Sequence, residues 1–424
     1  MFYTNFKLNY SFKFIFISTI LLLSTIGVYI NKINDLFCLT QQVTNVNTAF
    51  NTIFTIILFT LLFIIILNKK TIMEDKKLLL IYLFFIIFIY FLIFTNSSLV
   101  FFIMYELLLL LTIVIVYYNS PNIRSKVIAF YFVLWTQISS FILWVSVSYI
   151  YIKLNTFSFN ELAVSINNLE SKKVISLLIF TSFAIKLPLW PFSFWLLKTH
   201  VEANTSFSIF LSGVLVKTAL IGLIKFNFIF INIINPLYMY IIIFSLIATT
   251  GSISYQVDFK KLIAFTTVQE MTLITLFISY NNLNNSTLLV YFIVLHTIMS
   301  FLLFHLNELI YVRFKTRRTF LFLGIMTSLP KLNIIIILIW LLFISIPMSL
   351  KFFFEILILL KFFNLPIITL VTLIICLQFL TIIFFSKNTI SMLFGNGGKV
   401  TYDLTKNDIL NIVNPLLLLI VFIL

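Results

Sequence analysis

Six ionisable side chains lie inside long apolar stretches of this sequence, and the chemistry they share is the gain and loss of protons. They are Glu106, Lys186, Lys217, Glu270, His296 and Glu355. A charge in the middle of a membrane span costs about 2.5–3.5 kcal/mol on insertion scales, so such residues are a functional hypothesis by default. A low-dielectric surrounding disfavours the charged form of Lys and Glu alike, which brings both closer to exchanging a proton. The set predicts a proton-transfer path within the spans.

A structural role is the alternative for each of these residues taken singly. A buried ion pair or a hydrogen bond between two helices would also explain a polar side chain in an apolar span. Lys351 precedes Glu355 by four residues, so these two side chains can pair across one helical turn. Cys38 and Cys376 lack metal-ligand spacing, so the sequence offers no iron-sulfur, zinc or disulfide framework.

The composition indicates which solvent surrounds the chain. Of its 424 residues 62% are hydrophobic and 10% are charged, whereas ordinary soluble domains carry about 25% charged residues. The bilayer is the solvent that fits this composition. The net charge of +15 comes from basic residues in short connections, where they set the orientation of the spans. We therefore expect no nucleic-acid partner.

Apolar runs of about 20 residues, the length that crosses a bilayer, recur along the whole chain. We predict an all-α polytopic membrane protein with about thirteen transmembrane helices. The expected spans are 14–30, 50–68, 78–96, 98–118, 127–151, 174–196, 205–226, 235–252, 262–280, 286–311, 332–362, 366–386 and 409–424. Heavy use of Phe, Ile, Asn and Lys is expected of a very AT-rich genome and favours an organelle-encoded protein.

Basic residues predict which end of each span faces which side. Clusters at Lys69–Lys77, Arg124–Lys126, Lys260–Lys261 and Arg313–Arg318 all follow even-numbered spans. The positive-inside rule places such connections on one side of the membrane. The N-terminus is therefore predicted on that same side.

Prolines predict two broken helices. Pro188 and Pro191 interrupt the sixth span and Pro347 the eleventh, and each removes a backbone hydrogen bond. Because the two breaks are five spans apart, the chain is predicted to contain two inverted five-helix repeats, a common transporter layout. The expected parts are N-terminal helices at 1–76, a first repeat at 77–230, a second repeat at 231–390 and a C-terminal helix at 391–424.

Several motifs resemble the subunit 4 family of NADH:ubiquinone oxidoreductase, respiratory complex I. They are Phe183-Ala184-Ile185-Lys186-Leu187-Pro188-Leu189-Trp190-Pro191-Phe192, His200-Val201-Glu202-Ala203, Ser212-Gly213-Val214-Leu215-Val216-Lys217, Lys260-Lys261-Leu262-Ile263-Ala264-Phe265 and Phe354-Glu355. The resemblance covers roughly residues 97–390. The His200 motif and a Glu at position 355 favour subunit 4 over its sister subunits. One departure is Gln269-Glu270, which stands where relatives commonly have Ser-His.

The resemblance implies a role for each candidate residue. Glu106 and Lys186 would be a coupled pair, Lys217 a middle station, His296 a relay and Glu355 the terminal group, with Glu270 in the position of a relay His. It also implies no cofactor in this chain, with FMN, iron-sulfur clusters and quinone in partner subunits. The implied partners are other membrane-arm subunits, including antiporter-like subunits 2 and 5, and phospholipids such as cardiolipin. The implied location is the mitochondrial inner membrane, with the N-terminus on the matrix side.

Two other functions remain open on the sequence. A cation/proton antiporter subunit would exchange sodium for protons in vesicles that contain no quinone reductase. A structural membrane-arm subunit would contact its neighbours through apolar faces and conduct nothing.

Overall fold

The computed structural model describes residues 76–119, 123–166, 171–230, 236–280, 286–322, 324–344, 351–352, 355–356, 368–394, 402–405, 408–409, 411–413 and 415. Within these ranges the structure is helical, with no β-strand beyond two isolated bridges. The predicted all-α polytopic fold is therefore confirmed. The predicted spans 14–30 and 50–68, the break at Pro347 and most of span 409–424 lie outside the described residues.

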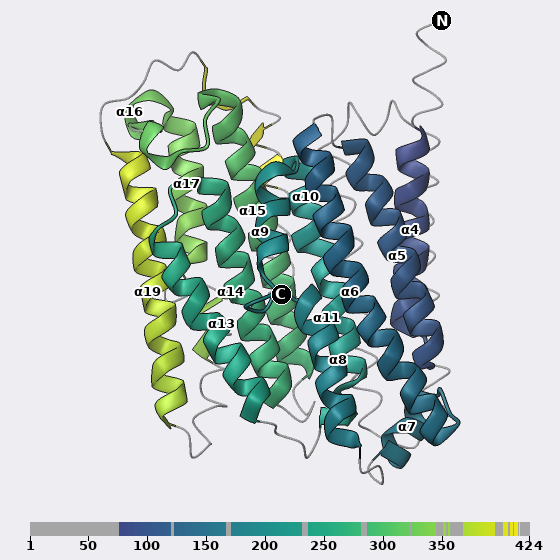
Figure 1. Cartoon of the computed structure of the whole chain (residues 1–424). Helices are drawn as coiled ribbons and strands as arrows, with labels where there is room; N and C mark the ends of the chain where they lie inside the picture. The colour runs from purple at the N-terminus through teal and green to yellow at the C-terminus, as the bar shows by residue number, and fades with distance from the viewer. Residues whose placement is uncertain are drawn as a thin grey trace, which may run out of the picture.

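Long apolar helices run side by side along one axis of the molecule (Figure 1). Six of those described are long and apolar enough to cross a membrane, and three shorter apolar helices accompany them. The main helices are α4 (Lys76–Phe94), α5 (Ser98–Asn119), α6 (Ile123–Leu154), α8 (Lys172–Lys186), α9 (Phe194–Glu202), α10 (Thr205–Phe210), the π-helix η2 (Leu211–Leu215), α11 (Val216–Lys225), α13 (Pro236–Ser254), α14 (Phe259–Tyr280), α15 (Ser286–Phe314), α17 (Pro330–Phe343) and α19 (Ile368–Leu393). Short helices α7 (Phe159–Ser165), α12 (Asn227–Phe230) and α16 (Ile325–Ser328) lie in connections.

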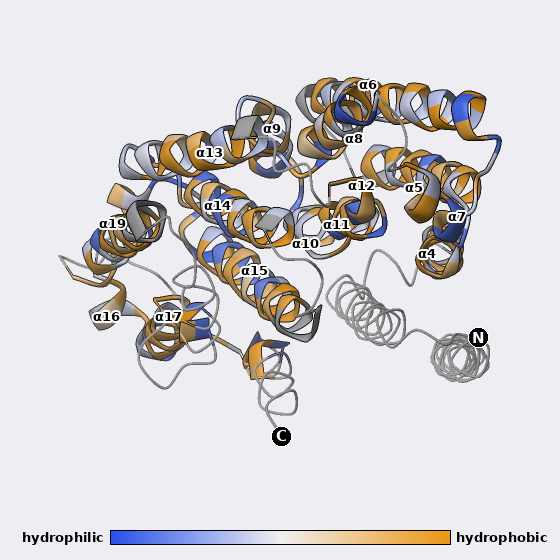
Figure 2. Cartoon of the chain, turned by 90° about the horizontal axis from the view of Figure 1, so that it is seen from below, coloured by the Kyte–Doolittle hydropathy of each residue, from blue (hydrophilic) through white to orange (hydrophobic). Residues whose placement is uncertain are grey.

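The spans differ in how much of their surface the rest of the chain covers. In an 18-residue stretch of the span Thr205–Lys225 all residues are buried, and in stretches of the same length 94% are buried in Phe259–Ser279 and in Phe292–Phe314. By contrast, only 28% are buried in Lys126–Leu154 and in Ile374–Leu393. Seen along the helix axes, α14 lies between α13 and α15, while α6 and α19 lie at the outside (Figure 2). The three covered spans form the interior in which polar side chains must find partners.

Two short backbone closures join the ends of helix pairs. In the first hairpin closure Ser97 pairs with Ser158, and the N–H of Ser98 donates to the carbonyl of Phe157 at 2.9 Å. In the second, Asp258 pairs with Arg318, and the N–H of Phe259 donates to the carbonyl of Arg317 at 3.0 Å. The closures tie α5 to the end of α6 and α14 to the end of α15.

A rare backbone conformation repeats with these closures. Asn155 (φ 54°) directly follows α6 and Lys315 (φ 56°) directly follows α15, and such left-handed backbone is uncommon outside glycine. Each feature recurs about 160 positions later in the chain, which is the signature of an internal repeat. The first closure lies next to α7 and the second is followed by α16, and these two helices lie at opposite ends of the bundle (Figure 1). The two units are therefore inverted, as the sequence predicts.

The first predicted break is present between α8 and α9. Helix α8 ends at Lys186, and the prolines that follow it cannot donate to the preceding turn. The indole Nε1 of Trp195 instead donates to the carbonyl of Ile185 at 2.8 Å. The break therefore leaves Lys186 at a helix end inside the bundle, with its neighbouring carbonyl satisfied.

Candidate functional site

The first cluster consists of Tyr105 and Glu106 on α5 and Lys186 at the end of α8. The Lys186 Nζ lies 3.3 Å from the centre of the Tyr105 ring, and the Lys186 side chain is buried. Among the described residues, Glu106 Oε1 and Tyr105 Oη have no hydrogen-bond partner, and Lys186 forms no ion pair within 4 Å. The Lys186 ammonium lies against an aromatic face and is not paired with the neighbouring Glu106 carboxylate.

A small cavity adjoins this cluster. It has a volume of about 20 Å³, and its polar lining comes from Tyr105, Thr112, Thr136, Lys186 and Thr218. A cavity needs about 10–15 Å³ and several polar partners to hold one water molecule. This one therefore has room for a single water between Lys186 and α11.

Lys217 lies on α11, directly after the π-helix. Its side chain is fully buried, and Nζ lies 2.8 Å from His296 Nδ1 on α15. Nζ also donates to the carbonyl of Ser212. In the π turn the N–H of Val216 bonds the carbonyl of Leu211, not that of Ser212. The wide turn thus supplies the acceptor for the Lys217 ammonium, and π-bulges often occur at functional sites for this kind of reason.

Glu270 on α14 connects His296 to Lys351. Glu270 Oε1 lies 2.6 Å from Lys351 Nζ, and Glu270 Oε2 lies 3.7 Å from His296 Nε2. Lys351 Nζ also donates to the carbonyl of Phe343 at 3.0 Å and lies 3.8 Å from Glu355 Oε1. Lys217, His296, Glu270, Lys351 and Glu355 therefore form a series in which each polar group lies within 4 Å of the next, and we call this series the central cluster.

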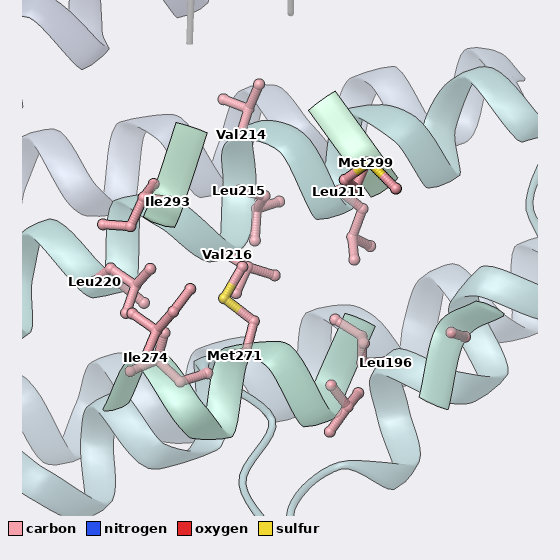
Figure 3. Close-up of a cluster of buried hydrophobic side chains, with 14 of the residues drawn as sticks. Leu196, Leu211, Val214, Leu215, Val216, Leu220, Met271, Ile274, Ile293 and Met299 are labelled. Atoms are coloured by element: carbon pink, nitrogen blue, oxygen red, sulfur yellow. The ribbon is translucent and has the colours of Figure 1, made fainter. Parts of the chain in front are cut away.

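Apolar side chains pack between the helices that carry the central cluster. Figure 3 shows Leu, Ile, Val and Met side chains filling the space where η2 and α11 approach α14, among them Val216, Leu220, Met271 and Ile274. In such a medium opposite charges attract strongly and an uncompensated charge is expensive. Two lysines and two glutamates in the cluster balance when all four are ionised. A proton can therefore pass from one member of the cluster to another without a change in the net charge.

Three other cations, Lys260 buried and Lys225 and Arg317 partly buried, donate to carbonyl groups at helix ends. Lys225 Nζ donates to the carbonyls of Leu92 and Thr95 at 3.0 and 2.7 Å, at the C-terminal end of α4. Lys260 Nζ donates to the carbonyl of Ala203, and Arg317 Nη1 donates to that of Val201 at 2.7 Å, both at the C-terminal end of α9. Cations are favoured at this end of a helix. These contacts account for the positions of Lys225, Lys260 and Arg317, and no role in proton transfer is needed to explain them.

The structure groups the predicted residues in two places. Glu106 and Lys186 form the first cluster, and Lys217, Glu270, His296 and Glu355 belong to the central cluster. Lys351 is the residue that the sequence prediction left with only a structural pairing. Its principal partner is Glu270, 81 residues away, and not Glu355 on its own helical turn. The sequence did contain a signal for this residue, because Lys351 also lies within an apolar segment.

A family model described as "NADH:quinone oxidoreductase/Mrp antiporter, TM" matches residues 95–381, more than half of the chain. NADH-ubiquinone oxidoreductase chain 4 of Paramecium tetraurelia is 37% identical over 242 residues, which is 56% of this chain and 50% of the relative. The corresponding protein of Acanthamoeba castellanii is 34% identical over 189 residues, or 44% of this chain and 38% of the relative. The chain thus matches about half or less of the length of these relatives.

Two solved structures share the fold. A chain of the Mrp complex from Dietzia sp. DQ12-45-1b superposes with a TM-score of 0.78 at 14% identity, covering 92% of this chain and 76% of that one. A chain of respiratory complex I from Thermus thermophilus superposes with a TM-score of 0.74 at 19% identity, covering 86% of this chain and 79% of that one. At these identities the similarity concerns the fold.

Proposed function

Because this chain belongs to the NADH:quinone oxidoreductase/Mrp antiporter transmembrane family, we propose that it translocates protons as a core membrane-arm subunit of NADH:ubiquinone oxidoreductase. The observation that carries the proposal is the central cluster, in which Lys217 Nζ and His296 Nδ1 are 2.8 Å apart and Glu270 follows. The names of the relatives support the same assignment. The division into units at 77–230 and 231–390 is part of this proposal.

Protons would pass along a line of side chains. Glu106 and Lys186 form the first station, and the cavity beside Lys186 offers one water site toward α11. Lys217 is the middle station, His296 and Glu270 act as relays, and Glu355 is the terminal group. Moving one proton against a membrane potential requires about 2.3 kcal/mol per 100 mV. Coupling must therefore change the energies of these stations by at least that amount.

The energy source lies outside this chain in our proposal. NADH oxidation and quinone reduction take place in partner subunits that carry FMN and iron-sulfur clusters. The direct neighbours would be the antiporter-like subunits 2 and 5, with phospholipids such as cardiolipin at the apolar faces. We place the chain in the mitochondrial inner membrane with its N-terminus on the matrix side, because the basic connections follow even-numbered predicted spans.

Replacing Lys217 by Gln in the assembled complex tests the proposal. Gln cannot carry the proton that the step requires, so fewer protons should be translocated per NADH oxidised. Native gels measure assembly, and a pH-sensitive dye in sealed vesicles measures translocation. An assembled Lys217→Gln complex with unchanged protons per NADH would contradict the proposal. Sodium–proton exchange in vesicles without quinone reductase would favour the antiporter alternative.

A further inference from the structure

The second unit contains an acid–lysine pair that mirrors the pair of the first unit. Lys186 is the last residue of α8, and Lys351 donates to the carbonyl of Phe343, the last residue of α17. Each lysine also faces an aromatic ring, Tyr105 at 3.3 Å and Phe343 at 4.1 Å. The acid partner lies on the second helix of each unit, Glu106 on α5 and Glu270 on α14. Lys351 therefore lies beside the end of the fourth helix of its unit and close to the acid of the second helix, as Lys186 does in the first unit.

The two pairs differ in their contacts. Lys186 makes no ion pair within 4 Å among the described residues, whereas Lys351 and Glu270 are 2.6 Å apart. The closed pair lies between two longer separations, 3.7 Å from Glu270 to His296 and 3.8 Å from Lys351 to Glu355. Both exceed ordinary hydrogen-bond length. The line of ionisable groups is thus interrupted on either side of the pair.

A single movement would close both interruptions. An ammonium group has three N–H donors. In Lys351 one donates to Glu270 and one to the Phe343 carbonyl, and Glu355 Oε1 lies 3.8 Å from Nζ. If Nζ moves from Glu270 toward Glu355, the second separation shortens and the Glu270 carboxylate is released toward His296. The same movement thus connects the pair to both neighbours.

We propose that Lys351 is a proton-carrying station between Glu270 and Glu355, an inference that rests on the function proposed above. In the transfer step Lys351 Nζ gives one proton to a carboxylate oxygen of Glu355, which leaves a neutral amine and a neutral carboxyl group. A proton from protonated His296 converts the Glu270 carboxylate to the acid. That acid then protonates the Lys351 amine, which restores the ammonium and the Glu270 carboxylate.

Replacing Lys351 by Arg separates this role from a purely structural ion pair. Arginine keeps the positive charge and can bond Glu270, but it is not deprotonated in proteins. In the assembled complex in sealed vesicles, Lys351→Arg should lower the number of protons translocated per NADH oxidised as much as Lys217→Gln does. The matched control is Lys225→Arg, the same change at a partly buried lysine that bonds the end of α4, and it should translocate as the wild type does.

The outcomes distinguish the inference from the proposed function. If Lys217→Gln reduces protons per NADH and Lys351→Arg does not, the station is wrong and the proposed function stands. If Lys217→Gln changes nothing, the proposed function itself fails. Should Lys351→Arg not assemble, Lys351→Gln removes the ammonium group and leaves the relay Glu270 in place. Full translocation by that assembled variant would show that the Lys351–Glu270 pair is only structural, and loss of translocation would support the station.

Discussion

Lys186 illustrates how one buried cation can be stabilised without a direct ion pair. Its ammonium lies over the Tyr105 ring, and a desolvated cation–π contact contributes about 2 kcal/mol or more. The neighbouring carboxylate of Glu106 supplies the compensating charge at longer range. Because the ring is a weaker partner than a bound carboxylate, this contact fits the proton-carrying role that we propose for Lys186.

The ring, and not the hydroxyl, should therefore matter at position 105. Tyr105 Oη has no hydrogen-bond partner among the described residues, so Tyr105→Phe should leave assembly and protons per NADH close to the wild-type values. Tyr105→Leu removes the aromatic face and should lower both. Native gels and vesicle translocation measure the two quantities. Equal damage by the two substitutions would contradict the cation–π role.

Sequence reasoning identifies buried charges more readily than their partners. Lys186, Lys217 and Glu270 stand out because each interrupts an apolar span. The pairing of Glu270 with Lys351 joins residues 81 positions apart, and no local spacing encodes it. Lys225 is a similar case, since its acceptors lie on α4, more than a hundred residues away. Such contacts follow from helix packing, which periodicity alone does not specify.

At the scale of elements, close helix approach positions the segment that carries Lys217. A Cβ added at Gly222 on α11 would lie 2.4 Å from Phe183 Cε1 on α8 and 2.9 Å from Phe101 Cζ on α5. No ordinary contact is that short, so glycine is required where these three helices meet. The π turn of η2 lies about two to three turns before this contact and supplies the Ser212 carbonyl that accepts from Lys217.

Gly222→Ala should destabilise the protein because the two phenylalanine rings must move. Overpacking of a core costs about 1–3 kcal/mol, which should lower the temperature at which the assembled complex loses activity. Gly251→Ala is the matched control, since nothing lies within 4 Å of a Cβ there. It should be neutral or slightly stabilising, because alanine favours the helix by about 0.5–1 kcal/mol. Equal effects of the two variants would contradict the packing argument.

At the scale of elements, the sequence predicts the membrane spans and the first helix break, but it does not predict η2 or α7. Hydropathy and proline position fix α5, α14 and the end of α8. The π turn changes one hydrogen bond within a continuous apolar helix, so it alters neither composition nor periodicity. Helix α7 has seven residues and lies in a connection, which is too short for a periodic signal.

At the scale of the whole molecule, Asp403 and Asp408 tie helices of the second unit together. Asp403 accepts the N–H of Lys331 at 2.8 Å and that of Leu332 at 3.3 Å, at the start of α17. Asp408 accepts from Arg313 Nη2 on α15 at 3.0 Å and from the N–H of Thr405 at 3.1 Å. These carboxylates join two helices through a segment that follows them by 70 residues or more.

Stability of this connection should depend on pH through Asp408, which precedes the last predicted span. Burial alone would raise the pKa of Asp408, but hydrogen bonds from Thr405 and Arg313 and the charge of Arg313 hold that pKa below its ordinary value of 3.8. A lowered carboxyl pKa stabilises the folded state above the ordinary value, and this contribution is lost as the pH falls through the lowered pKa. The ion pair is therefore fully formed at neutral pH.

Asp408→Asn should loosen the segment at neutral pH. Hydrogen exchange at the amides of Leu404 and Thr405 should be roughly tenfold faster than in the wild type, since a hydrogen bond to a charged group contributes about 1.5 kcal/mol. The difference between the two proteins should shrink at acidic pH, below the ordinary pKa of the carboxyl. Exchange that is identical at neutral pH would exclude this role for Asp408.

The two hairpin closures also set the depth of the acids in the membrane. Glu106 follows Ser97 by nine residues and Glu270 follows Asp258 by twelve, which corresponds to about 14 Å and 18 Å of helix rise. Because the closures lie at opposite ends of the bundle, these depths are counted from opposite faces of a hydrocarbon layer about 30 Å thick. The two carboxylates then stand at nearly the same level, close to the bilayer midplane. A proton moving between the units would therefore travel sideways along the membrane, at nearly constant distance from either surface.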